Sequence, residues 1–307
     1  MPRMNILSSL EKEACDTPPH FSGVERKKYF ELPAIIWQLV KNLRSPTNQV
    51  RFALAYGYFR ATKCFFPGAP HQRDLEYVCR QLRIPISSIH LEHSAKAAHS
   101  RNRQQILAHF GFSEFDKTVR DALQTEIEVM VRSHLKPRLI FYRAIDILIE
   151  QKVALPSSDA LSKLILKTLN HRRKELEVII EQSLSCETRE FLDRLLEKAT
   201  DVNDEPINRS RLTLLKRCSQ STRPGKIKES ISDLELIRGL QEQVQPVLEK
   251  LGLPYDGISY FANSVIRSET FKVPRRAEKD RYLHLIAFIT HQFFRLQDNL
   301  IDVFLTT

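Results

Sequence analysis

The sequence predicts an all-α protein, and three observations predict it. Glycine provides only 8 of the 307 residues, so few positions suit the positive-φ turns that join β-hairpins. Leu, Ile, Arg, Lys, Glu and Gln are plentiful, and all of them favour helix. Apolar residues recur at spacings of three and four along much of the chain, as one buried helix face requires. With 42% hydrophobic residues, the chain can bury the cores of two or three domains.

Two capping boxes mark the first helix starts. Ser8 is followed three residues later by Glu11, and Ser22 by Glu25. In this pattern the serine side chain accepts from a backbone N–H of the first turn, and the glutamate reaches back to the serine N–H. We therefore expect short helices to start beside Ser8 and Ser22.

Prolines mark the next two helices. Pro33 suits the first helical position, and the residues at 34–43 give an apolar face. Ser45 followed by Pro46 predicts an N-cap and an N1 proline. The helix that they open contains many aromatic residues and should end before the break at 67–70.

Two outlines of a helix-turn-helix follow. An amphipathic helix is predicted over 74–82, with an interruption at 83–85 and a second helix beginning within 86–89. The outline repeats with a helix over 101–110, a turn at 111–113 and a further helix from about residue 114. The glycine of this turn fits the left-handed position that ends helices.

The middle of the chain predicts an antiparallel helical bundle over residues 120–200. Its helices are expected at 139–149, 161–184 and 191–199, where apolar residues follow a helical period. The polar, proline-containing stretch 200–209 is the best candidate for a linker.

The last hundred residues are also expected to be helical. A polar, basic break at 219–228 precedes a helix over 234–251, which Gly252 ends. The longest element is predicted over 277–305, which holds neither proline nor glycine. No stop signal follows it, so we expect the sequence to be truncated.

The helix over 277–305 carries one polar seam. A membrane span is not expected here, because each central charge would cost about 2.5–3.5 kcal/mol on insertion scales. We expect a core helix of a soluble domain. The seam consists of Arg281, His284, His291, Arg295, Asp298 and Asp302.

The charge is uneven along the chain. The formal net charge is +10, and residues 1–120 alone hold 18 Lys and Arg against 10 Asp and Glu. Residues 121–210 are close to neutral. We expect three domains: a basic helical DNA-binding domain over 1–120, a bundle over 121–205 that is a second DNA-binding or positioning module, and a helical domain over 206–307. A basic surface that binds nothing specific is the alternative.

No catalytic motif is visible. The chain lacks a P-loop, a GxSxG and a GxGxxG after a strand. His90 and His93 stand three apart, with Glu92 between them, but no further metal ligands accompany them. The five cysteines form no CxxC pair and no signal peptide precedes them, which indicates reduced thiols and a cytoplasmic protein. We expect no catalytic residue, no metal and no cofactor in this chain.

Basic and polar residues near the two helix-turn-helix outlines are the candidate DNA contacts. Lys and Arg pair with phosphates, while Ser and Gln can reach base edges. The main candidates are Arg60, Lys63, Ser87, Ser88, His90, Lys96, His99, Arg101, Arg103 and Gln104. The secondary candidates, which could instead be ordinary exposed helix faces, are Arg172, Arg173, Lys174, Lys226 and Lys228.

Three stretches resemble transposases of the Tn-three (class II, replicative) family. They are MPRMNIL at 1–7 with ERKKYFELP at 25–33, FALAYGYFRATK at 52–63 with FFP at 65–67, and RYLHLIAFI at 281–289 with LQDNLID at 296–302. Together these stretches span nearly the whole chain in the family's order.

The resemblance implies the helical N-terminal region of a transposase. Such a region recognises the terminal inverted repeats of the transposon as double-stranded DNA, and the full-length enzyme dimerises to pair the two ends. In this family the DDE catalytic core follows farther along and uses Mg²⁺, so no catalytic residue is carried over to this sequence. The resemblance also implies a bacterial, nucleoid-associated protein of DNA transposition and recombination.

Two other functions stay open. A helical scaffold could bind proteins through its apolar faces without specific DNA binding, although no repeat period indicates a solenoid. A helical RNA-binding protein is the third possibility, but the RNP aromatic motif and a KH-type GXXG loop are both missing.

Overall fold

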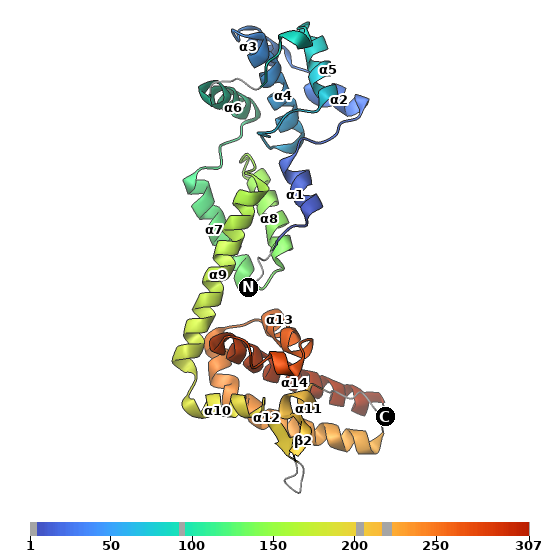
Figure 1. Ribbon diagram of the computed structural model, residues 1–307, viewed down its shortest axis with the longest axis vertical. Coiled ribbons are helices and arrows are strands. Elements are labelled where there is room, and N and C mark those ends of the chain that lie inside the picture. The colour runs from blue at the N-terminus through green and yellow to red at the C-terminus, as the bar shows by residue number, and fades with distance from the viewer. Residues whose placement is uncertain (1–4, 92–95, 201–205, 217–222, 307) are drawn as a thin grey trace. The chain divides into compact units, whose positions relative to one another are not determined.

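The computed structural model describes residues 5–91, 96–200, 206–216 and 223–306 (Figure 1). It confirms the all-α class, because helices make up nearly all of its regular structure. Two compact units form, each with its own core. Unit 1 comprises residues 1–128 and 136–168, and unit 2 comprises residues 129–135 and 169–307.

The regular elements in the described residues of unit 1 are α-helices and one short 3₁₀ turn, η1. Two of its helices, α7 and α9, run on into unit 2. The elements are α1 (Ser9–Asp16), α2 (Gly23–Phe30), α3 (Ala34–Lys41), α4 (Pro46–Thr62), α5 (Gln72–Leu82), η1 (Ile86–Ser88), α6 (Lys96–Phe110), α7 (Lys117–Arg132), α8 (Pro137–Glu150) and α9 (Ser158–Ser183).

The cap signals predict the first helices correctly. Ser8 and Ser22 are the N-caps of α1 and α2, and both complete reciprocal capping boxes. The Ser45 side chain accepts from the Asn48 N–H, and Pro46 occupies the first turn of α4. Pro33 is the N-cap of α3 rather than its first helical residue.

Helix α4 is the centre of the α2–α6 part of unit 1, where it packs against α2, α3, α5 and α6 (Figure 1). Its Phe52, Tyr56 and Phe59 form one core cluster with α3 and α6. On another side, Ala53 and Tyr58 form a second cluster with α2 and α5. The helix is therefore apolar nearly all round, as expected of a buried helix.

The first helix-turn-helix outline is wrong. Arg83 adopts a left-handed conformation, with φ of 57°, and ends α5. The expected second helix is only the 3₁₀ turn η1, because Ile89 is already extended. The next helix, α6, begins at Lys96.

The second outline matches better. Helices α6 and α7 both form, and Gly111, with φ of 66°, ends α6 as predicted. Residue Ser113 then pairs with the strand-like segment at 152–154, donating to the Lys152 carbonyl and accepting from the Ala154 N–H. Asp116 caps α7 by accepting from the Val119 N–H, so the helix begins at Lys117 instead of residue 114.

Unit 2 is built around two long helices, α12 and α14, and the shorter α13 (Figure 1). Residues 282–290 of α14 are all buried, and they form the core with α12, α13 and the second half of α9. The elements are α10 (Cys186–Arg194), β1 (Lys198–Thr200), β2 (Pro206–Ser210), α11 (Arg211–Leu215), α12 (Pro224–Leu251), α13 (Tyr255–Ile266), η2 (Thr270–Lys272) and α14 (Glu278–Thr306).

Unit 2 departs from the sequence prediction in four places. The helix expected over 191–199 is α10, which ends at Arg194, and residues 198–200 form β1. The expected linker at 200–209 contributes to an antiparallel strand pair, in which Lys198 faces Ser210. Helix α12 starts at Pro224, inside the expected break, since proline suits the first helical turn. Helix α13 was not predicted. Gly252, with φ of 55°, does end α12 as expected.

The three-domain division over 1–120, 121–205 and 206–307 stays a prediction. The expected middle segment contributes residues to both compact units, and the change from unit 1 to unit 2 falls inside α9.

Candidate nucleic-acid interface

A groove of about 880 Å³ in unit 1 is lined by two of the predicted DNA contacts, His99 and Arg103. Helix α6 forms one side with His99, Ser100, Asn102 and Arg103, which helical spacing of three and four brings together. The segment 64–70 and residues of α4, among them Arg51, Leu54 and Ala55, also line the groove. The lining thus combines cationic and polar groups with aromatic and aliphatic groups.

Arg51 is the groove residue that the sequence analysis missed. Its guanidinium lies 3.3 Å from the Nε2 atom of His99, and it donates to the carbonyl of Leu91. Partial burial lowers the pKa of the Arg51 guanidinium, which stays charged at neutral pH. The available signal was that Arg51 is the only charged residue between Pro46 and Phe59.

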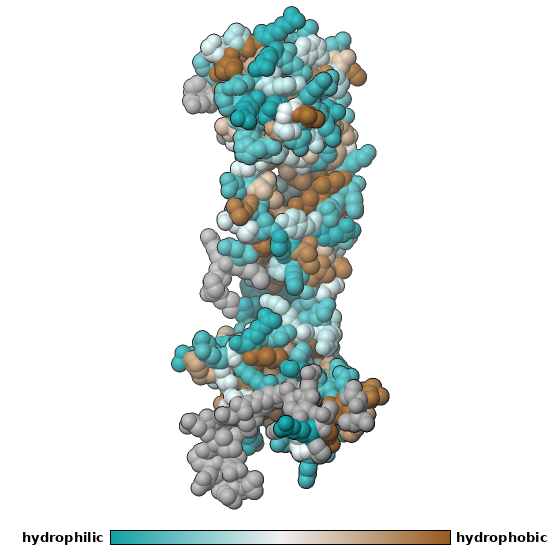
Figure 2. All heavy atoms as spheres, turned by 90° about the vertical axis from the view of Figure 1, so that its right-hand side faces the viewer, coloured by the Kyte–Doolittle hydropathy of each residue, from teal (hydrophilic) through white to brown (hydrophobic). Residues whose placement is uncertain are grey.

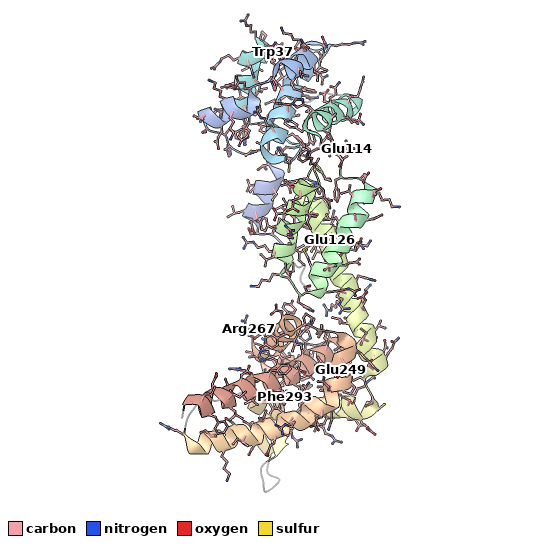
Figure 3. The ribbon with its side chains drawn as sticks, turned by 180° about the vertical axis from the view of Figure 1, so that it is seen from behind. Trp37, Glu114, Glu126, Glu249, Arg267 and Phe293 are labelled. Atoms are coloured by element: carbon pink, nitrogen blue, oxygen red, sulfur yellow. The ribbon has the colours of Figure 1, made fainter. Side chains whose placement is uncertain are left out.

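Arg103 lies against an aromatic column. Its Cζ atom is 4.7 Å from the ring centroid of Phe65, which stacks on Phe59 at 4.7 Å with an interplanar angle of 26°. The Arg103 Nε atom is also 3.5 Å from Glu114, which lies on the connection between α6 and α7 (Figure 3). The ring and the carboxylate together fix the position of this guanidinium beside the groove.

Two predicted DNA contacts, Lys63 and Arg60, form hydrogen bonds within unit 1 instead. Lys63 ends α4 in a left-handed conformation, and its ammonium donates to the Arg60 carbonyl. The same ammonium lies 5.5–6.0 Å from the ring centroids of Phe59, Phe110 and Phe112. Burial lowers the pKa of Lys63. Arg60 donates to the carbonyl of Glu31.

The remaining candidates of unit 1 are exposed. Arg101 and Gln104 lie on α6, while Ser87, Ser88 and His90 lie on or just after η1. The Ser88 hydroxyl donates to the carbonyl of Pro85, a local turn contact. The side chain of Lys96 lies outside the described residues, as do Glu92 and His93.

The secondary candidates belong to unit 2, where two of them form ion pairs. Arg172 pairs with Glu175 at 3.0 Å, and Arg173 pairs with Asp280 at 2.8 Å and with Glu177 at 3.2 Å. These two arginines therefore stabilise unit 2 itself. Lys174 and Lys228 are exposed, and the side chain of Lys226 lies outside the described residues.

Neither a candidate metal site nor a candidate membrane span occurs among the described residues. No group of three or more His, Cys, Asp or Glu side chains that could hold a metal ion occurs in the described ranges. Among the same residues, no helix has the length and apolar character that a membrane crossing needs. The face drawn in Figure 2 is largely hydrophilic, and its apolar surface is broken into separate patches.

One comparison with known families gives a match. The model of a family described as a domain of unknown function, DUF4158, matches residues 6–168, just over half of the chain. The matched range includes every groove residue. No curated protein that we compared with the chain matches it.

Proposed function

The chain belongs to the DUF4158 family, and from this starting point we propose that it binds double-stranded DNA through unit 1. Domains of this family are often found in transposases. We infer that the DNA is the terminal inverted repeat of a transposon, and that the chain is the non-catalytic N-terminal part of a replicative transposase. Such a protein would work in the bacterial cytoplasm, associated with the nucleoid, and the full-length enzyme would pair two ends as a dimer.

One observation carries the proposal: α6 gathers cationic and polar side chains on a single helix. Arg101 and Gln104 are exposed on it, and His99 and Arg103 line the groove, where Arg51 joins them from α4. The major groove of DNA admits an α-helix, whose Arg and Gln side chains can contact base edges and phosphates. The Lys63 ammonium and the secondary arginines are not needed for this interface.

The test measures affinity and its salt dependence. A gel-shift assay compares inverted-repeat DNA, a scrambled duplex and RNA, and we expect the inverted repeat to bind tightest. The log–log slope of affinity against salt should be near −0.9 for each phosphate contact. Replacing Arg51 and Arg101 together by Gln should flatten this slope by about one to two.

Lys167→Gln is the matched control, because Lys167 is exposed on α9 within unit 1, away from the groove residues. It should leave the slope unchanged. Equal binding of all three nucleic acids, or an unchanged slope in the double variant, would contradict the proposal.

A protein-binding scaffold is the second candidate, and exposed apolar side chains on unit 2 favour it. Ile301, Phe304 and Leu305 of α14 are exposed by 55%, 61% and 80%. The scaffold function predicts no preference for any DNA in the same gel-shift assay.

A further inference from the structure

We propose that the groove between α6 and the segment 64–70 receives one unpaired nucleotide of the bound DNA. The base would stack on the guanidinium of Arg103. This inference rests on the proposed DNA binding, and it adds a subsite for a nucleotide that has left the duplex.

The stacked column beside the groove is the first argument. The ring centroids of Phe59 and Phe65 lie 4.7 Å apart. The Cζ atom of Arg103 lies 4.7 Å from the Phe65 centroid. Phe65 and Arg103 both line the groove, whereas Phe59 does not. Bases stack on aromatic rings and on guanidinium planes, so a base would continue this column.

The polar side of the groove is the second argument. A guanidinium nitrogen of Arg51 lies 3.3 Å from the ring Nε2 atom of His99, and both residues line the groove. An arginine there can hold a phosphate of the displaced nucleotide by charge-assisted hydrogen bonds. The same groove therefore offers a stacking surface and a phosphate partner.

The dimensions are the third argument. The groove, at about 880 Å³, falls within the range of roughly 300–1,000 Å³ that small-molecule sites occupy. A lone nucleotide fits such a volume, whereas a base of an intact duplex would first have to unpair and unstack, which costs free energy. Apolar groups, including Leu54, Ala55 and Phe66, supply the rest of the lining and would exclude water from the base.

The first experiment compares two duplexes of identical sequence, one fully paired and one with a single extra unpaired thymine. Because a base gains affinity by stacking on a planar group, the full chain should bind the bulged duplex about tenfold tighter. Arg103→Lys keeps the charge and removes the planar group, and it should reduce the ratio of the two affinities towards one.

Arg44→Lys is the matched control, since Arg44 is exposed after α3 and does not line the groove. The affinity ratio should stay about tenfold in this variant. An Arg103→Lys protein that keeps the full ratio would overturn the stacking role.

The second experiment needs no variant. The unpaired thymine is replaced by 5-iodouracil, and irradiation should cross-link it to a peptide from segment 64–70 or α6, identified by mass spectrometry. Cross-links confined to other elements would overturn the proposal. Equal affinity for the two duplexes would overturn this inference alone, whereas no binding of either duplex would overturn the proposed function as well.

Discussion

Asp74 is the most completely buried charged side chain among the described residues, at 1% exposed. It accepts from the Arg26 Nε atom at 2.6 Å and from the Tyr58 hydroxyl at 2.9 Å. Burial, together with the neighbouring Asp74 charge, raises the pKa of Tyr58, so the phenol stays protonated and keeps donating. A buried carboxylate is tolerated when it is paired in this way.

Replacing Asp74 by Ala should lower the free energy of unfolding by about 3–5 kcal/mol, because it leaves the Arg26 charge uncompensated. Urea unfolding followed by circular dichroism measures the change. Lys12→Ala is the control, since Lys12 forms an exposed pair with Asp159 at 3.8 Å. That change should stay within about 0.5 kcal/mol. Equal effects of the two substitutions would contradict the importance of the buried network.

Two helical glycines differ in the space around them. A Cβ atom at Gly57 of α4 would lie 2.0 Å from the Phe30 ring, whereas one at Gly239 of α12 would meet no atom within 4 Å. Gly57→Ala should therefore destabilise the protein by about 1–3 kcal/mol or more, because the core is overpacked. Gly239→Ala should stabilise it by about 0.4–1 kcal/mol, since alanine lowers the entropy of the unfolded chain.

Thermal unfolding of the two alanine variants tests both signs in one experiment. A Gly57→Ala protein as stable as the parent would show that Phe30 can move aside at little cost.

At the scale of elements, local signals predicted helix starts and stops well. The serines at 8, 22 and 45 cap their helices by accepting from an N–H only three residues away. Gly111 and Gly252 end their helices because glycine readily adopts a positive φ. Such features depend on a few adjacent residues. The sequence therefore fixes them without knowledge of the fold.

Elements that depend on distant contacts were predicted less well. The helix expected at 86–89 is only a 3₁₀ turn, and the pairing of Ser113 with residues at 152–154 was not predicted. The groove could not be predicted for the same reason, because it depends on contacts between residues far apart in the sequence. Arg51 and His99 are 48 residues apart, so only the packing of α4 and α6 brings them together.

Three histidines give unit 2 a pH-dependent stability. Burial lowers the pKa of His134, His284 and His291 from the ordinary value of 6.5. At His134, Arg172 lowers the pKa further, and Asp256 opposes the change. The unfolded chain then binds more protons than the folded chain below pH 6.5, so stability should be complete above this pH and fall as the pH is lowered through it.

Thermal unfolding across this pH range measures the effect, and His134→Gln should make the fall less steep. The same substitution at exposed His90 is the control. A midpoint that rises as the pH drops below 6.5 would contradict the prediction.

At the scale of the whole molecule, the two units have separate cores. The core of unit 2 draws on α9 to α14, whereas the clusters around α4 hold only residues of unit 1. Trp37, on α3 in unit 1, is the single tryptophan of the chain (Figure 3). Its fluorescence therefore reports on unit 1, while circular dichroism reports on both units.

Phe288→Ala should separate the two signals. Phe288 is fully buried in unit 2, and its loss should cost about 3–5 kcal/mol. We expect an earlier circular dichroism transition and an unchanged Trp37 transition in urea. Asp74→Ala, in unit 1, should shift the Trp37 transition as well as the circular dichroism signal. A common shift of both signals in the Phe288→Ala protein would show that the units unfold as one.

The packing of α4 on several sides has a consequence for hydrogen exchange. Eight of its residues are buried, so its backbone amides in the middle turns can reach solvent only when the surrounding helices detach together. These amide protons should be the slowest of unit 1 to exchange with deuterium. Helix α1, which has no buried residue, should exchange through local fraying long before them.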